Sequence, residues 1–161
     1  MRFVRAELEQ AGFVGWLPFD QVRAQHTCPT TGGVYVVVYN ATGPVRFAAE
    51  STGGWFKGKD PTTSQAILIA NWVDGAEVVY IGKSDNLRRR LREYADFGSG
   101  KAVGHWGGRL IWQLASTGDL RVAWKETLGQ LPAAIEASLL ASFKEHHGKP
   151  PFANNPHKLG L

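Results

Sequence analysis

A run of β-branched and aromatic residues, from Val34 to Tyr39, constrains the fold of this chain more than any other feature. Residues of these types pack well on a pleated surface, so the run predicts a buried strand. Gly32 and Gly33 come directly before it and allow the chain to turn tightly into the strand. A buried strand needs neighbouring strands and covering elements, so we expect the chain to fold around a sheet.

Other segments supply those neighbours. Glu77 to Ile81 and Leu120 to Trp124 predict strands, and Val45 to Ala48 predicts a shorter one. Helices are predicted at residues 65–72 behind Thr63 or Ser64, 86–95 with Asp85 as N-cap, 109–114 and 132–146. The order of these elements predicts an α/β fold in which a small sheet of three or more strands is sandwiched by helices.

Length and composition indicate one soluble domain. The chain has 161 residues, of which 43% are hydrophobic and 20% charged, so we assign residues 1–161 to a single domain. Residues 1–30 are expected to form an N-terminal extension, a helix followed by an irregular segment. No apolar run approaches the roughly 20 residues that span a bilayer, and no secretory signal is recognisable. We therefore expect a cytoplasmic protein without membrane contact.

Cysteine and charge narrow the classes of function further. Cys28 is the only cysteine, which excludes an intrachain disulfide and a cysteine-based zinc site. The net charge is +4, and four arginines fall within five consecutive positions: Arg88, Arg89, Arg90 and Arg92. Such a cluster is compatible with a polyanionic partner, although helix arginines are also commonly solvated.

The segment Tyr80-Ile81-Gly82-Lys83-Ser84 leads from a strand into the arginine-rich helix. A strand followed by Gly-Lys-Ser and a helix is typical of phosphate-binding P-loops. That motif needs a glycine five positions before Gly82, where this chain has Glu77. The pattern therefore excludes a P-loop nucleotide hydrolase, and alone it predicts a strand-to-helix turn with a surface lysine.

Five elements taken together carry a more specific signal. In chain order they are Gly33-Val34-Tyr35, Tyr80-Ile81-Gly82-Lys83-Ser84, Arg90-Leu91 with Tyr94, Glu136-Ala137-Ser138-Leu139-Leu140, and Pro151-Phe152-Ala153-Asn154. This set resembles the signature of the GIY-YIG nucleases over residues 32–155. The resemblance implies a compact α/β domain that cuts DNA with a divalent cation, Mg²⁺ or Mn²⁺. The residues that match the family's functional positions are Tyr35, Tyr80, Lys83, Arg90, Tyr94, Glu136 as the metal ligand, and Asn154, with Asn155 as an alternative to Asn154.

The chemistry of phosphodiester hydrolysis suits these residue types. It needs an activated water, neutralised charge at phosphorus and help for the leaving oxygen. Glu136 is a hard oxygen ligand for Mg²⁺, and Arg90 can hold a phosphate through two hydrogen bonds. A tyrosine has an ordinary pKa of about 10, so Tyr35 can act as the base only if a cation lowers its pKa, a role predicted for Lys83. Tyr80 is then expected to position the water or the phosphate.

Two regions lie outside the motif. The two tyrosine-containing halves usually lie close together, whereas here residues 43–77 intervene, an insert that is either a substrate-recognition loop or a surface loop with its own small helix. His105 lies in a glycine-rich segment and is either an additional proton carrier or a structural residue. We expect nucleic-acid contacts from Lys57, Lys59, Arg88, Arg89, Arg92 and Arg109.

Three functions are compatible with these observations. The favoured one is a metal-dependent endonuclease acting on DNA, with a catalytic site of Tyr35, Tyr80, Lys83, Arg90, Tyr94, His105, Glu136 and Asn154. The alternative is a nucleic-acid-binding module on the same fold that does not cut. The third is a small protein-interaction domain, whose DNA binding would be weak and insensitive to salt. The sequence leaves open the DNA preference, the oligomeric state and any protein partner.

Overall fold

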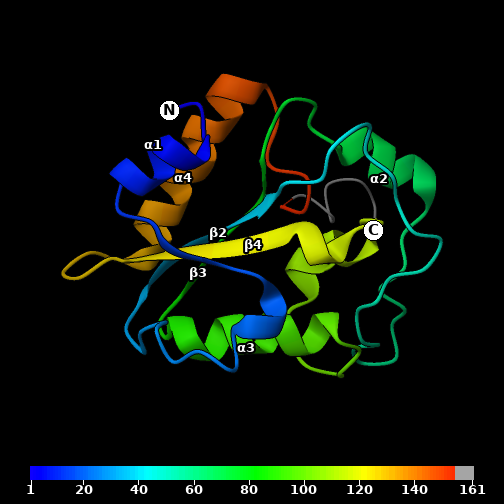
Figure 1. The fold of residues 1–161 in the computed structure, drawn as a ribbon, viewed down its shortest axis with the longest axis horizontal. Coiled ribbons are helices and arrows are strands. Elements are labelled where there is room, and N and C mark those ends of the chain that lie inside the picture. The colour runs from blue at the N-terminus through cyan, green and yellow to red at the C-terminus, as the bar shows by residue number, and fades with distance from the viewer. Residues whose placement is uncertain (155–161) are drawn as a thin grey trace.

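The computed structural model describes residues 1–154 and shows an α/β fold around a four-stranded antiparallel sheet (Figure 1). The strands are, in spatial order, β1 (Val14–Leu17), β4 (Leu120–Glu126), β2 (Gly33–Tyr39) and β3 (Val78–Ser84). The run that begins at Val34 lies in β2 inside the sheet, and residues 33–38 are all buried. The predicted small sheet sandwiched by helices is confirmed.

Helices cover both faces of the sheet: α1 and α4 lie on one face and α3 on the other (Figure 1). Val34, Val36 and Val38 belong to the core under α1 and α4, whereas Tyr35 and Val37 belong to the core under α3. Alternate residues of β2 thus supply the two cores, as the two-residue period of a strand requires. The helices and 3-10 turns are α1 (Arg5–Gln10), η1 (Phe19–Gln21), α2 (Gln65–Asn71), α3 (Leu87–Gly98), η2 (Trp106–Gln113), η3 (Thr117–Asp119) and α4 (Pro132–His147).

The pairing of β2 with β3 brings the two halves of the motif together. Tyr35 lies opposite Gly82 and Val37 lies opposite Tyr80, so both tyrosines point to the same face of the sheet. A Cβ atom at Gly82 would overlap the ring of Tyr35. The glycine of the second half is therefore needed for the first tyrosine to lie flat across its neighbouring strand.

Residues 1–30 contain a strand that the sequence did not predict. β1 pairs with β4 through a bulge between Gly15 and Leu17, and both Gly15 and Trp16 have positive φ angles of 107° and 57°. A Cβ atom at Gly15 would overlap the ring of Trp124, so only glycine fits there. A short edge strand with a bulge has no regular alternation of polar and apolar residues, which explains why it was missed.

Other predicted elements differ in detail. Val45 to Ala48 does not form a strand of the sheet, because only Phe47 pairs, in an isolated bridge with Leu114. Asp85 is not the N-cap of α3: the side chain of Asn86 accepts a hydrogen bond from the backbone N–H of Arg89 at 3.0 Å. The helix expected at residues 109–114 is a 3-10 segment that begins earlier, at Trp106. Within residues 1–154, no helix is long and apolar enough to cross a membrane.

Candidate active site

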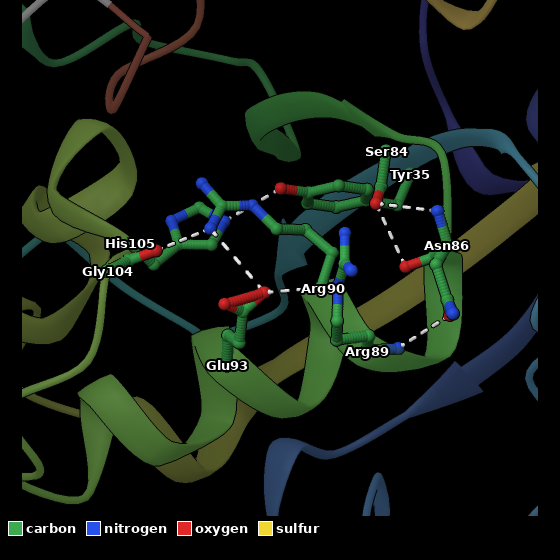
Figure 2. Close-up of polar contacts among 8 residues, drawn as sticks. All are labelled: Tyr35, Ser84, Asn86, Arg89, Arg90, Glu93, Gly104 and His105. Atoms are coloured by element: carbon green, nitrogen blue, oxygen red, sulfur yellow. Dashed lines mark hydrogen bonds and ion pairs between the residues drawn. The ribbon is translucent and has the colours of Figure 1, made fainter.

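The turn from β3 into α3 fixes the position of the arginine-rich helix. The hydroxyl of Ser84, at the end of β3, accepts from the backbone N–H of Asn86 at 3.0 Å and donates to its carbonyl at 2.9 Å (Figure 2). Asn86 in turn caps α3 through the N–H of Arg89. Because the Ser84 and Asn86 bonds join residues close in sequence, they fix where α3 begins relative to the end of β3. Arg90 follows about one turn into the helix.

Four aromatic rings meet between β2, β3 and α3. The ring centroids of Tyr35 and Tyr80 are 6.0 Å apart, and those of Tyr80 and Tyr94 are 5.4 Å apart. The ring of Tyr94 stacks on that of His105 at 3.5 Å, and its hydroxyl donates to the carbonyl of Gly108 at 2.6 Å. The hydroxyl of Tyr94 is thus used within the protein, and its ring holds the imidazole in place.

A short hydrogen bond joins the two central residues of this group. The hydroxyl of Tyr35 lies 2.7 Å from Nε2 of His105, and both side chains are buried (Figure 2). Burial raises the pKa of Tyr35 well above its ordinary value and lowers the pKa of His105 well below its own, with Arg90 adding to the second shift. At neutral pH the pair is therefore a protonated phenol and a neutral imidazole.

The prediction that Lys83 lowers the pKa of Tyr35 is wrong. The cation that lowers the pKa of Tyr35 is Arg90, and burial outweighs it. Lys83 instead lowers the pKa of Glu136, which burial raises. The reason is the alternation of β3: Tyr80 and Gly82 point to the face under α3, whereas Lys83 points away from it.

Arg90 joins the helix to the segment that carries His105. Its guanidinium donates to the carbonyl of Gly104 and lies 3.9 Å from a carboxylate oxygen of Glu93 (Figure 2). Its side chain is 30% exposed, so it can also bind an anion from solution. Glu93 was not among the predicted site residues, although its position three residues after Arg90 on a helix indicates such contact.

Glu136, on α4, lies near the aromatic group through Tyr80. Burial raises the pKa of Tyr80 to about 12, Arg90 lowers it in part, and Glu136 raises it further. Glu136 is therefore a neighbour of both Tyr80 and Lys83. Among residues 1–154, no hydrogen bond or ion pair involves the carboxylate of Glu136.

The oxygen ligand that the site offers, the carboxylate of Glu136, suits a hard cation that the protein holds through few ligands. No group of three or more histidine, cysteine, aspartate or glutamate residues in the described part of the chain is placed to hold a metal ion. Mg²⁺ commonly keeps several waters and takes one or two carboxylates plus substrate phosphate. The unpaired carboxylate of Glu136 fits that requirement, and a thiolate or imidazole site for zinc does not fit.

An open cleft of about 640 Å³ is lined by two of the candidate residues, Lys83 and Arg90, and Arg89 adds a third basic side chain. Asp85 and Glu93 also line it, so its charge is mixed with a net positive excess. A larger hollow of about 800 Å³ lies at the other end of β2, around Tyr39, and none of the candidate residues line it. The candidate residues therefore adjoin the smaller cleft and not the larger hollow.

The side chain of Asn154 binds the backbone of β3. Its side-chain amide donates to the carbonyl of Ile81 at 2.7 Å and accepts from the N–H of Ile81 at 2.9 Å. The backbone N–H of Ala153 also donates to the carbonyl of Val79 at 2.8 Å. The segment thus pairs with β3 beside Tyr80, and Asn154 positions that strand. Asn155, the alternative, lies outside the described residues.

Replacing Asn154 with alanine is expected to lower the free energy of unfolding by about 1–3 kcal/mol, because two backbone groups of β3 lose their partners. Urea denaturation measures this change. Asn40→Ala, at an exposed position directly after β2, is the matched control and should leave stability close to that of wild type. Equal stability of Asn154→Ala and wild type would contradict the assignment.

Several basic residues expected to contact nucleic acid are bound within the protein. Arg109 is only 4% exposed, donates to the carbonyl of Trp106 at 3.1 Å and covers its ring, so the prediction that it contacts nucleic acid is wrong. Arg88 donates to the carbonyls of Cys28 and His26, and Arg92 contacts the ring of His26 at 3.0 Å. Arg89, Lys57 and Lys59 are exposed.

The insert at residues 43–77 packs on the rest of the domain. The N–H of Gly54 donates to the carbonyl of Phe97 at 2.9 Å, and the amide of Gln113 bonds both backbone groups of Thr63 at 2.8 Å. The ring of Phe56 lies against Gly104, next to His105. Trp55 is 59% exposed. The insert therefore supports the loop that carries His105, and both interpretations of its outer surface stay open.

The burial of His105 predicts how stability depends on pH. Below a pH of about 6.5 the unfolded chain binds a proton at this position that the folded chain does not, because folding lowers the pKa. The contribution of His105 is therefore constant above that pH and falls by up to about 1.4 kcal/mol per pH unit below it. His105→Gln should remove this loss.

Urea denaturation of wild type and His105→Gln between about pH 5 and 8 measures the difference. The stability advantage of wild type should shrink as the pH falls. His26→Gln, at an exposed histidine, is the control. A difference that does not change with pH would contradict the prediction.

Comparisons of the chain with protein-family models, with curated proteins and with solved structures found no match. The functional assignment therefore depends on the motif residues and on the geometry of the site described above.

Proposed function

We propose that this protein is a metal-dependent endonuclease of the GIY-YIG type that hydrolyses phosphodiester bonds in DNA. The observation that carries the proposal is the hydrogen bond between Tyr35 and His105 in a group that also contains Arg90. A buried phenol bonded to a neutral imidazole, beside an accessible guanidinium, is an arrangement suited to proton transfer next to a bound phosphate.

The chain's own residues provide a path for the proton. Tyr35 accepts a proton from the attacking water while its own phenolic proton passes to Nε2 of His105, so the phenol never carries a full negative charge. The water oxygen bonds to phosphorus as the P–O bond to the leaving oxygen breaks, and that oxygen takes a proton from solvent. This path needs the His105 tautomer protonated on Nδ1, which leaves Nε2 free to accept. The lowered pKa of His105 keeps the ring neutral at neutral pH, so Nε2 has a free lone pair, while the same burial makes the imidazole a weaker base.

The other residues hold the phosphate. Arg90 binds its non-bridging oxygens and neutralises charge that develops during attack. Tyr80, between Arg90 and Glu136, orients the water or the phosphate through its hydroxyl. When bound at Glu136, Mg²⁺ or Mn²⁺ would supply further neutralisation of charge at the phosphate. Burial raises the pKa of Glu136, and Lys83 offsets part of that rise and so favours the ionised carboxylate that the cation needs.

Cleavage of supercoiled plasmid and of labelled single-stranded DNA, with Mg²⁺, Mn²⁺ or EDTA, tests the proposal. Nicking or linearisation that needs metal is expected from wild type. Glu136→Gln protein prepared in the same way controls for contaminating nuclease. Salt-sensitive binding without cleavage under any metal would reject the nuclease and favour the non-cleaving module.

A further inference from the structure

The turn between β4 and α4 carries two unusually exposed leucines. Leu128 and Leu131 are each 74% exposed, the highest values among the large apolar side chains of the described residues. The turn projects from the body of the protein, at the left of Figure 1. A single exposed leucine is common and needs no explanation. Two exposed leucines on one projecting turn form an apolar tip. Their side chains contribute hydrophobic free energy only when another surface covers them.

The backbone of this turn is well held. The N–H of Gln130 donates to the carbonyl of Thr127 at 2.9 Å, and the N–H of Thr127 donates to the carbonyl of Gly32 at 3.2 Å. Gly129 has a φ of 76°, which glycine adopts without strain and which closes the turn. The two leucines are therefore presented by a fixed support, which lowers the entropic cost of inserting them into a partner.

The tip adjoins the basic cleft of the candidate active site. Leu131 and Pro132 line that cleft together with Lys83, Arg89 and Arg90. The cleft carries three basic side chains against the acidic Asp85 and Glu93, and Glu93 lies about as close to Arg89, at 4.0 Å, as to Arg90. An apolar tip beside a net basic cleft suits a partner with anionic groups on its outside and flat apolar surfaces within.

Duplex DNA has that combination. Its phosphates would lie along the basic cleft, and the faces of its base pairs are its main apolar surface. Proteins that kink a duplex insert leucine and similar side chains between base pairs, at a cost of a few kcal/mol per unstacked step that new contacts offset. A second copy of this chain carries a net charge of +4, so it complements the basic cleft less well than a polyanion does.

We propose that Leu128 and Leu131 form a wedge that enters duplex DNA and unstacks a base-pair step next to the phosphate held by Arg90. The inference rests on the proposed function and deepens it, because it makes duplex rather than single-stranded DNA the substrate. The unstacking bends the duplex into the cleft and brings one phosphate to Arg90, which lines the cleft.

A fluorescent base tests the wedge without cleavage. Short duplexes with 2-aminopurine at different internal positions are titrated with protein in EDTA, because unstacking raises the fluorescence of this base. Wild type is expected to raise it several-fold at one or more positions. The double variant Leu128→Ala, Leu131→Ala should bind with reduced affinity and give little rise even at saturation, followed by anisotropy of a labelled duplex.

Ile69→Ala is the matched control, since Ile69 is 64% exposed on α2 and does not line the cleft. It should behave as wild type. An equal rise with the double variant, no rise with wild type, or no binding to duplex would each overturn the wedge. A wild-type dimer that the leucine variant converts to monomers would show that a second copy covers the tip.

Cleavage is measured separately, so the two proposals fail in different ways. Metal-dependent cutting without a fluorescence rise overturns the wedge alone. A fluorescence rise that depends on both leucines, without cutting, supports the wedge and overturns the nuclease.

Discussion

Glu136→Gln protein is expected to cleave DNA about 1000-fold more slowly than wild type, because loss of metal-based stabilisation of roughly 4 kcal/mol in the transition state corresponds to that factor. Glutamine keeps the size and shape of the side chain but removes the charge that a hard cation needs. Since the carboxylate has no hydrogen-bond or ion-pair partner among residues 1–154, the fold should keep its stability. Single-turnover cleavage at saturating Mg²⁺ measures the effect.

Glu145→Gln is the matched control, because Glu145 is an exposed residue of the same helix. It should cleave as wild type does. The apparent affinity for Mg²⁺ should also fall as the pH falls, so that more Mg²⁺ is needed for half-maximal cleavage. Burial raises the pKa of Glu136, and a proton therefore competes with the cation at a higher pH than at an ordinary carboxylate. Cleavage by Glu136→Gln at the wild-type rate would reject Glu136 as the metal ligand.

Arg90→Ala is expected to slow cleavage by about 100-fold to 1000-fold, the usual cost of removing a group that stabilises charge in a transition state. The guanidinium lies beside both Tyr35 and Tyr80 and is partly open to solvent, so it can meet a phosphate at the point of attack. Arg90→Lys should recover only part of the rate, since an ammonium keeps the charge but lacks the two-pronged geometry.

Arg89→Ala provides the comparison, because Arg89 lines the same cleft one position earlier and points to solvent. It should weaken binding in a salt-dependent way with little effect on the rate at saturation. Thermal melts of both variants separate a loss of chemistry from a displaced Gly104 loop. If Arg89→Ala and Arg90→Ala slowed the saturated rate equally, the catalytic assignment of Arg90 would be wrong.

Local pattern was enough to predict most of the scaffold. The apolar run in β2, the alternation in β4 and the helical spacing in α4 each depend on neighbours in sequence, and all three elements lie where they were predicted. Val45 to Ala48 was mistaken for a strand because β-propensity does not reveal whether a partner is present. β1 has a partner but an irregular pattern, so the opposite error occurred.

The site was predictable as a set of residue types and only partly as an arrangement. The motif placed Tyr35, Tyr80 and Arg90 in one group, and their mutual effects on pKa agree with it. It could not show that His105, far along the chain, lies 2.7 Å from Tyr35. It also could not show that Arg109 is buried, because an arginine's partners depend on tertiary contacts.

The bonds between Asn154 and Ile81 have a consequence beyond the single chain. β3 is an outer strand of the sheet, and an unpaired outer strand is a template on which a second molecule can add its own strand and start aggregation. The side-chain amide of Asn154 bonds to the N–H and the carbonyl of Ile81, as the backbone of a neighbouring strand would, and so occupies this edge next to Tyr80. The same few residues that bond to the backbone of β3 thus also cover part of the edge on which a strand of another molecule could otherwise pair.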